Sequence, residues 1–507
     1  MANPSVPDAQ GARGSAAPDP SPRSAEPGTA GGAGEPDLAR RLGAFPATNI
    51  VIANMIGAGI FTTSGLLMGQ LGDARLLLVL WVAGGALALL GALCYGELGA
   101  ALPRAGGEYA YLGSLFHPLL GFLTGWVSFF VGFSAPLAAS ALGFSEYLGR
   151  AWPQLFAASD PAFVRKAVAL LVIGVLAAVH LRGVEFGARV QNFFSVGKVA
   201  LIAGLVAAGF ALGHGDVARL GAALGLWGQP AADSASSAAG SAAASAVAAP
   251  AGFAGWRAVG LSLMWIMFAY SGWNASGYVG SEIRDPARNI PRSLLAGTGI
   301  VTLLYLGLNL LYVYALEPAE MRGVVAVGAA AAARLFGGAA EIAVSALIAF
   351  ALVSSVSALI LLGPRVYYAM ARDGYFFRAV ARVDRGTRAP SVAISLQCLI
   401  AAAMVLTGTF DQILTYMGFC LGIFPIVAVA GVVKLRRAGT LPFRMPLYPL
   451  PPLLYAAAGV AMLALSYAER PVESSIAVVT VLAGIPLYLV FSRTRRGPGG
   501  SGGAAGA

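Results

Sequence analysis

Charged residues are scarce in this chain of 507 residues: Asp, Glu, Lys and Arg make up 11%, whereas hydrophobic residues make up 58%. A soluble protein carries roughly a quarter charged residues, so a soluble fold is excluded. Histidine and cysteine are also rare, at 3 residues each. The histidines share no metal-ligand spacing, and no P-loop, Rossmann fingerprint or HExxH motif occurs. We therefore expect no cofactor, no metal, no catalytic residue and no enzymatic activity.

Long apolar runs take the place of the missing charge. They are about 20 residues long, the length of a membrane-spanning helix, and they lack the alternation of barrel strands. Because backbone in lipid must satisfy its own hydrogen bonds, the runs predict an all-α integral membrane protein. Twelve transmembrane helices are predicted, at residues 44–71, 76–102, 118–148, 167–181, 190–212, 259–281, 294–316, 339–370, 392–406, 413–433, 450–467 and 476–491.

The remaining segments are polar or of low complexity. Residues 1–43 lack the apolar core of a signal peptide and are predicted to be a disordered cytoplasmic tail. The expected organisation is a first five-helix group at 44–212, a low-complexity extracytoplasmic loop at 213–257, a second five-helix group at 258–437, two more helices at 438–492 and a disordered cytoplasmic tail at 493–507. Most Lys and Arg residues fall in alternate loops and in the tails. This bias places both termini in the cytoplasm and accounts for the net charge of +10 without a nucleic-acid partner.

The first predicted span contains Gly57-Ala58-Gly59 at its centre, although glycine costs about 1 kcal/mol relative to alanine inside a helix. Small residues also allow membrane helices to pack closely, so the motif alone is ambiguous. However, the sixth span has a similar interruption at Ser271-Gly272. These spans open two groups of five helices, and an odd number inverts the second group. Paired interruptions in corresponding helices indicate the substrate site of a transporter.

Both interruptions would free backbone N–H and C=O groups at bilayer depth, where they must face a cavity. The N-terminus of a half-helix favours a carboxylate, and freed carbonyls favour an ammonium group. Neither interruption contains Asp, Glu, Lys or Arg. The pattern therefore predicts a site for a zwitterion that is bound by peptide groups.

Five motifs support this interpretation: "IGAGIF", "YGELGAALPRAGGEYAYL", "FAYSGWN", "EIRDPARNIPRSL" and "GPRVYYAMARDG". At these residues the chain resembles amino acid permeases of the amino acid–polyamine–organocation (APC) superfamily, and it is most similar to the L-type transporter branch and its bacterial relatives. The resemblance extends over residues 45–437. It implies the leucine-transporter fold, with two inverted five-helix repeats plus two extra helices, and alternating access across the plasma membrane.

The resemblance also implies roles for residues of the two interruptions. In the first span, Met55 and Ile56 would lend carbonyls, and the N–H groups would come from Gly57, Ala58 and Gly59. In the sixth span, carbonyls for the substrate amino group would come from Phe268, Ala269 and Ser271. The Phe268 ring would act as a gate, and Trp273 and Asn274 would line the site, although aromatic residues also serve packing. Many L-type relatives have glycine in place of Ser271, so we expect a preference for smaller neutral amino acids.

Lys198 is the only charged residue of the fifth span and one of only three lysines. A buried lysine can lose its proton, whereas an arginine cannot, and an intramembrane charge is a candidate functional group. The alternative is that the side chain snorkels to the membrane surface. In several sodium-independent members of the fold, a lysine of the fifth helix fills the sodium site. The resemblance places Lys198 there, opposite Ser355, with Ser354 and Ser357 as alternatives. We therefore expect sodium-independent transport by proton coupling or by exchange.

Three acidic residues give weaker signals. Glu97 and Glu108 flank the loop after the second span, which the resemblance implies is a cytoplasmic structural element; a direct proton-carrying role for either residue is the alternative. Glu282 ends the sixth span beside Arg284 and Arg288, which suggests a surface salt bridge or, alternatively, a cytoplasmic gate.

Two rival functions remain open. A permease for cationic amino acids or polyamines would need an acidic residue facing the substrate side chain, and neither interruption supplies one. A non-transporting amino acid sensor would keep the site without the gates. Mammalian L-type relatives pair with a glycoprotein through a loop cysteine between the third and fourth spans. Residues 150–166 contain no cysteine, so we expect no disulfide-linked heavy chain. The Ala/Gly-rich, lysine-poor composition suggests a bacterial inner-membrane protein with lipid as its surroundings.

Overall fold

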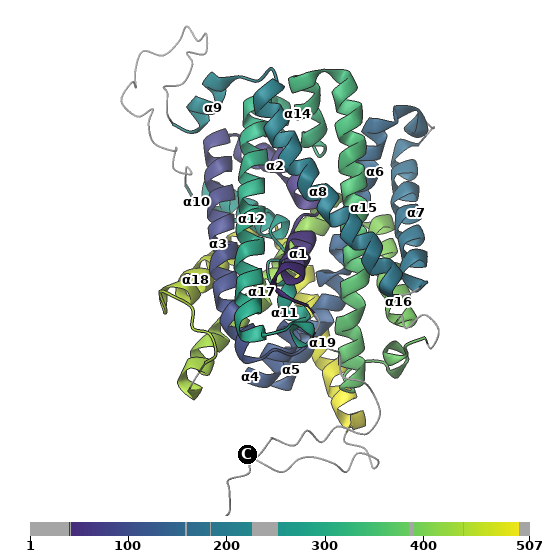
Figure 1. Cartoon of the computed structure of the whole chain (residues 1–507), viewed down its shortest axis with the longest axis vertical. Helices are drawn as coiled ribbons and strands as arrows, with labels where there is room; N and C mark the ends of the chain where they lie inside the picture. The colour runs from purple at the N-terminus through teal and green to yellow at the C-terminus, as the bar shows by residue number, and fades with distance from the viewer. Residues whose placement is uncertain are drawn as a thin grey trace, which may run out of the picture. The chain divides into compact units, whose positions relative to one another are not determined.

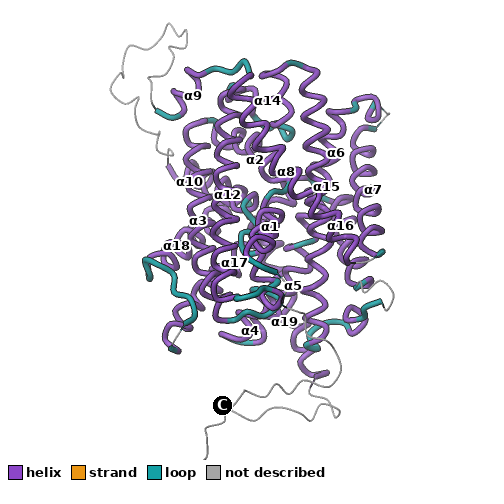
Figure 2. Tube along the Cα trace, in the orientation of Figure 1, coloured by secondary structure: helices purple, strands orange, loops and turns teal. Residues whose placement is uncertain are grey.

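A computed structural model describes residues 40, 42–157, 160–182, 184–225, 252–384, 390–439 and 441–495, without the side chains of 184–195 and 494–495. The Ala/Ser-rich stretch and nearly all of both predicted tails lie outside these ranges. Within them all regular structure is helical, as Figure 2 shows, apart from the isolated bridges Leu42↔Ile283 and Ala105↔Val279. The predicted all-α class is therefore confirmed.

The helices are numbered along the chain (Figure 1). The first ten are α1 (Ala44–Met55), α2 (Ala58–Leu71), α3 (Ala74–Ala101), α4 (Glu108–Leu115), α5 (Pro118–Val127), α6 (Ser134–Ala151), α7 (Pro161–Leu181), α8 (Val184–Leu212), α9 (Val217–Ala223) and α10 (Gly252–Ala269). The others are α11 (Ala275–Tyr278), α12 (Pro286–Ala315), α13 (Pro318–Met321), α14 (Val327–Phe336), α15 (Gly338–Arg372), α16 (Ser391–Thr407), α17 (Phe410–Ala438), α18 (Leu450–Glu469) and α19 (Pro471–Arg495). A π-helix, Ser128–Gly132, joins α5 to α6.

Each of the predicted spans falls on one of these helices or on a broken pair. Among the described residues, 10 helices are long and apolar enough to cross a membrane. The pair Val196–Leu212 and Val217–Ala223, bent by 118°, raises the number to 11 if it forms one span. Helix α16 is shorter, with 17 residues. The multi-pass membrane architecture is thus confirmed, and the count of twelve stays a prediction.

The two interrupted spans lie side by side and run in opposite directions. Helix α1, before the first break, packs against α11, which follows the second break. Helix α2, after the first break, packs against α10, which precedes the second. The half-helix before each break therefore packs against the half-helix after the other break, as expected for the inverted five-helix repeats of the leucine-transporter fold.

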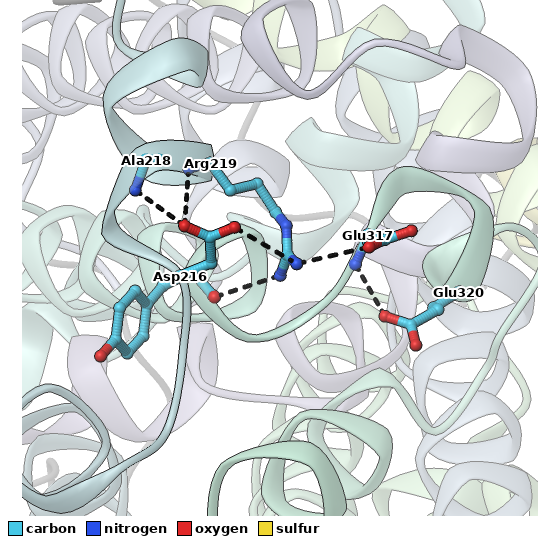
Figure 3. A network of polar contacts seen from close by, with 6 residues as sticks. Asp216, Ala218, Arg219, Glu317 and Glu320 are labelled. Atoms are coloured by element: carbon cyan, nitrogen blue, oxygen red, sulfur yellow. Dashed lines mark hydrogen bonds and ion pairs between the residues drawn. The ribbon is translucent and has the colours of Figure 1, made fainter. Parts of the chain in front are cut away.

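Short helices lie at the two ends of the bundle, with α9 and α14 at one end and α4 at the other (Figure 1). Helix α9 begins because the Asp216 carboxylate accepts hydrogen bonds from the backbone N–H groups of Ala218 and Arg219. The Arg219 guanidinium lies 3.7 Å from Asp216 and 3.5 Å from Glu317, which ties α9 to the start of α13 (Figure 3). The described ends of the predicted loop at 213–257 contain α9 and the first turns of α10, and its extracytoplasmic position stays a prediction.

Candidate functional site

The first break lies between Met55, the last residue of α1, and Ala58, the first residue of α2. Ile56 (ψ 89°) and Gly57 (ψ −159°) leave the helical conformation. The first N–H groups of a helix have no carbonyl in a preceding turn to accept their hydrogen bonds. The α2 N-terminus is therefore available to an anion from Ala58 onward.

The second break lies between Ala269, the last residue of α10, and Ala275, the first residue of α11. Gly272 has a φ of +96°, a conformation that L-residues with a side chain rarely adopt. The N–H of Ser271 donates to the Phe268 carbonyl at 2.8 Å and tightens the end of α10. This end presents the carbonyls of a helix C-terminus, which attract a cation.

Glycine is needed where the two breaks touch each other. A Cβ added to Gly59 would lie 2.6 Å from the Ala269 Cα. A Cβ added to Gly272 would lie 2.8 Å from the Asn54 Cβ. Real Cβ contacts essentially never fall below 3.0 Å. The poor helix formers in the middle of both spans therefore allow the two backbones to meet.

The breaks enclose a cavity of ≈ 130 Å³, far above the roughly 10–15 Å³ that one water molecule needs. It extends between α5, α6, α15, α17 and α18. Every predicted substrate-binding residue except Ile56 lines it: Met55, Gly57, Ala58, Gly59, Phe268, Ala269, Ser271, Trp273 and Asn274. The π-helix also contributes to the wall through Ser128 and Gly132, an irregularity of the third span that the sequence analysis missed.

Lys198 is 1% exposed, and its ammonium group donates to the carbonyls of Ala53 and Ile56, both at 2.7 Å. The Ser355 hydroxyl donates to the same Ile56 carbonyl at 3.0 Å. The structure thus brings Lys198 and Ser355 together at the end of α1. The snorkelling alternative is wrong, because the side chain ends on buried carbonyls.

The expectation that Ile56 lends its carbonyl to the substrate is also wrong. That carbonyl has two lone pairs, and Lys198 and Ser355 occupy both of them. Of the alternative serines, Ser357 lies 2.9 Å from the His180 Nε2 and is engaged there. Ser354 is buried on the same helix, and its role stays a prediction.

Tyr305 of α12 joins the two breaks and was missed by the sequence analysis. Its buried hydroxyl lies 2.6 Å from the Met55 carbonyl and 3.1 Å from the Ala269 carbonyl. One tyrosine therefore holds the last residues of α1 and α10 near each other. No signal in the sequence separates it from the other tyrosines of the apolar spans.

We expect Tyr305→Phe to weaken substrate binding about three- to tenfold, because a neutral hydrogen bond is worth about 0.5–1.5 kcal/mol. The apparent KM of uptake measures this effect. Tyr312→Phe is the matched control on the same helix, since the Tyr312 hydroxyl has no hydrogen-bond partner among the described residues. Equal KM values for the two variants would show that the Tyr305 hydroxyl does not position the breaks.

Glu97 and Glu108, both expected to be structural, have different surroundings. Glu97 is 0% exposed and forms a bidentate pair with Arg436, with both N–O distances 2.6 Å. The Met445 N–H donates to the same carboxylate at 2.8 Å. This arrangement fits the structural role. Glu108, in contrast, lines the cavity.

The Glu282 side chain forms no ion pair with a residue that the structure describes, so the expected surface salt bridge to Arg284 or Arg288 is not formed. Arg284 donates through Nε to the Arg40 carbonyl instead, at 3.3 Å. The backbone of Glu282 is used, because its carbonyl accepts from the Leu42 N–H at 2.9 Å. Its role as a gate stays a prediction.

Metal-binding side chains do not gather anywhere in the part of the chain that the structure describes: no group of three or more His, Cys, Asp or Glu residues could hold an ion. A bundle of membrane-length helices around two broken, antiparallel spans is the architecture of a secondary transporter. This class is what the fold and the site define together.

The chain belongs to the amino acid permease family, whose sequence model matches residues 42–489. Large neutral amino acids transporter small subunit 2 of Homo sapiens is 28% identical over 468 residues, which cover 92% of this chain and 83% of that protein. Asc-type amino acid transporter 1 of Mus musculus is 28% identical over 467 residues, covering 90% and 82%. The b(0,+)-type amino acid transporter 1 of Mus musculus is 26% identical over 458 residues, covering 90% and 88%.

Proposed function

We propose that this protein is a sodium-independent secondary transporter of α-amino acids, with a preference for small neutral ones. It acts in the plasma membrane of a bacterium with both termini in the cytoplasm, and it works by proton coupling or by exchange. The observation that carries the proposal is the cavity between two broken helices, whose exposed ends are peptide groups of opposite polarity. Family membership and the names of the relatives support the same substrate class.

The substrate carboxylate binds at the N-terminus of α2, near Gly57, Ala58 and Gly59, where N–H groups and the helix dipole favour an anion. The substrate amino group binds at the C-terminus of α10, where carbonyls converge. Phe268 and Trp273 enclose the rest of the molecule. Rocking of one helix group against the other then exposes the site to each side in turn.

Lys198 supplies a fixed cation at the end of α1. Its contacts with the carbonyls of Ala53 and Ile56 support this role, because carbonyl oxygens are also what a bound sodium ion would require. The conformation of the break then needs no external ion. Replacement of sodium by choline should leave uptake unchanged, and a steep dependence on external sodium would contradict the proposal.

Counterflow in proteoliposomes tests the transport function directly. Vesicles loaded with unlabelled alanine should take up labelled alanine transiently at equal pH on both sides. A sensor would bind alanine without flux. No disulfide-linked partner is needed in this scheme, so the purified chain alone should suffice.

Ser271 is proposed to limit the size of the substrate side chain, since it lines the cavity at the second break. We expect alanine to compete for uptake better than tryptophan. In Ser271→Gly, competition by leucine or tryptophan relative to alanine should rise about tenfold, the lower end of what one carbon-sized group contributes in a pocket. An unchanged ratio, or a wild-type preference for tryptophan, would reject the size limit.

A further inference from the structure

Glu108 is a buried carboxyl that neither the amino acid site nor the helix packing explains. It begins α4, outside the membrane-length helices, yet it is only 6% exposed. Among the described residues that line the cavity, it is the one with an acidic or basic side chain. Unlike Glu97, whose charge is matched by Arg436, it forms no ion pair with a described residue.

Both hydrogen bonds of the carboxyl group converge on one oxygen. The Tyr95 hydroxyl donates to Oε1 at 2.7 Å, and the Asn274 amide donates to the same atom at 2.8 Å. The other oxygen, Oε2, makes no hydrogen bond with a described residue. A proton can therefore occupy Oε2 while both existing hydrogen bonds are kept. Through Asn274, the carboxyl is joined directly to the second break.

The titratable groups that surround Glu108 are phenols from four helices, namely Tyr95, Tyr111, Tyr278 and Tyr455. Helices α5 and α17 both pack on α4; α5 carries no charged residue, and of the cations on α17, Arg437 is exposed and the other two are engaged elsewhere. Lys434 donates to the Leu115 carbonyl at the far end of α4, and Arg436 is paired with Glu97. Nothing among the described side chains therefore neutralises an ionised Glu108 except an added proton.

We propose that Glu108 is the proton-binding site of the transport cycle, and that the amino acid crosses the membrane together with the proton on this carboxyl. The inference rests on the proposed function and selects proton coupling over exchange. On the side where the proton enters, hydronium transfers its proton to the Glu108 carboxylate and leaves a water molecule. On the other side, the carboxylic acid returns the proton to water. One positive charge then moves with each zwitterion.

The environment of the carboxyl supports this assignment. Burial raises the pKa of Glu108 above the ordinary value of glutamate, and the hydrogen bonds from Tyr95 and Asn274 oppose the rise. The group therefore binds a proton at a higher pH than an exposed glutamate does. A buried carboxylate without a counterion is costly, so protonation favours the state in which the cavity is closed to water.

Glu108→Gln provides the central test, because glutamine mimics the protonated acid, keeps an acceptor for Tyr95 and Asn274, and cannot titrate. Alanine uptake is measured in proteoliposomes with and without an inward proton gradient. With one proton per alanine, wild-type accumulation should rise by up to about tenfold per pH unit of gradient. In the variant, the ratio of uptake with the gradient to uptake without it should fall to about one. Counterflow at equal pH is measured in the same preparations.

Glu473→Gln is the matched control, since Glu473, in the first turn of α19, pairs with Arg470 just before that helix and the variant should keep the wild-type ratio. Persistence of the gradient effect in Glu108→Gln would overturn the proposal and leave Lys198 as the candidate proton carrier. Wild-type protein with counterflow but no gradient effect would overturn it as well, without touching the transport function. Absence of wild-type counterflow would instead refute the transport function itself. If Glu108 served cationic substrates, the variant would lose arginine uptake with an unchanged gradient ratio for alanine, which also overturns the proposal.

Tyr95→Phe supplies a second test that keeps the carboxyl group and does not require Glu108→Gln to fold. Loss of the hydroxyl removes a donor that stabilises the carboxylate, so the pKa of Glu108 should rise further. The midpoint of the uptake–pH profile should move to higher pH by roughly half a unit. An unmoved midpoint, or a shift to lower pH, would show that Glu108 is not the titrating group.

Discussion

Lys198→Ala should reduce the initial rate of amino acid uptake about 100-fold. The substitution removes the ammonium donor from the buried carbonyls of Ala53 and Ile56. Hydrogen bonds to a charged group are worth about 1.5–3 kcal/mol each, and 1.4 kcal/mol corresponds to a factor of ten. Even a loss of about 3 kcal/mol from the transport-competent conformation would therefore give the expected decrease. Ser355, which donates to the same Ile56 carbonyl, cannot satisfy both acceptors alone.

Lys166→Ala is the control for this experiment. Lys166 also donates to a backbone carbonyl, that of Leu406, but in an exposed position. An exposed carbonyl can turn to water when its donor is lost, so uptake should change little. Both variants are assayed as purified protein in liposomes, with the amount of inserted protein measured. If Lys198→Ala transports as well as Lys166→Ala, the cation at the end of α1 has no role in the cycle.

Gly59→Ala should also abolish most transport, by a steric route. The new Cβ would lie 2.6 Å from the Cα and 2.7 Å from the Cβ of Ala269. Both atoms belong to or adjoin the backbone of α10, so no flexible side chain can move aside. Overpacking of this kind costs typically 1–3 kcal/mol, and here the strain separates the two half-helices that form the site. We expect at least a tenfold fall in uptake, seen mainly as weaker substrate binding.

Gly69→Ala separates this effect from a general intolerance of larger residues in α2. Its added Cβ would lie 3.5 Å from the Gly323 nitrogen, an ordinary van der Waals distance. Alanine also has the higher helix propensity, so this variant should be at least as stable as the wild type. Thermal unfolding of both variants in detergent identifies loss of the whole fold. A well-folded Gly59→Ala protein with wild-type KM would show that the breaks need not touch.

The sequence predicted the helices well because the bilayer sets their length and excludes other backbone solutions. It also predicted both breaks, since Gly57-Ala58-Gly59 and Ser271-Gly272 conflict with helix propensity at corresponding positions. A conflict between residue type and helix propensity of this kind can be recognised from the sequence alone. The helices α9 and α13 were not predicted, because seven- and four-residue helices carry too short an apolar pattern.

The partners of individual atoms could not be predicted, because they depend on where distant segments meet. The sequence does not distinguish Ile56 from the neighbouring residues of the first break, yet its carbonyl accepts a hydrogen bond from Lys198 and the residue does not line the cavity. Tyr305 donates to the carbonyl of Met55, 250 positions earlier in the chain, and no feature of the neighbouring sequence marks it. Glu108 was assigned a structural role with Glu97, and only the positions of Tyr95 and Asn274 distinguish the two.

The peptide groups that form the two ends of the site also affect the conformational change by which the substrate-free transporter returns to its starting state. A transporter that bound its substrate through a charged arginine or aspartate would have to bury that unpaired charge when it returned without substrate, at a cost of several kcal/mol. Dipoles at the ends of α2 and α10 leave no such ion behind when the solute departs. The groups that bind the amino acid therefore leave no charge of their own for the substrate-free protein to bury, and among the described side chains that line the cavity only the deprotonated Glu108 adds that cost to the return step.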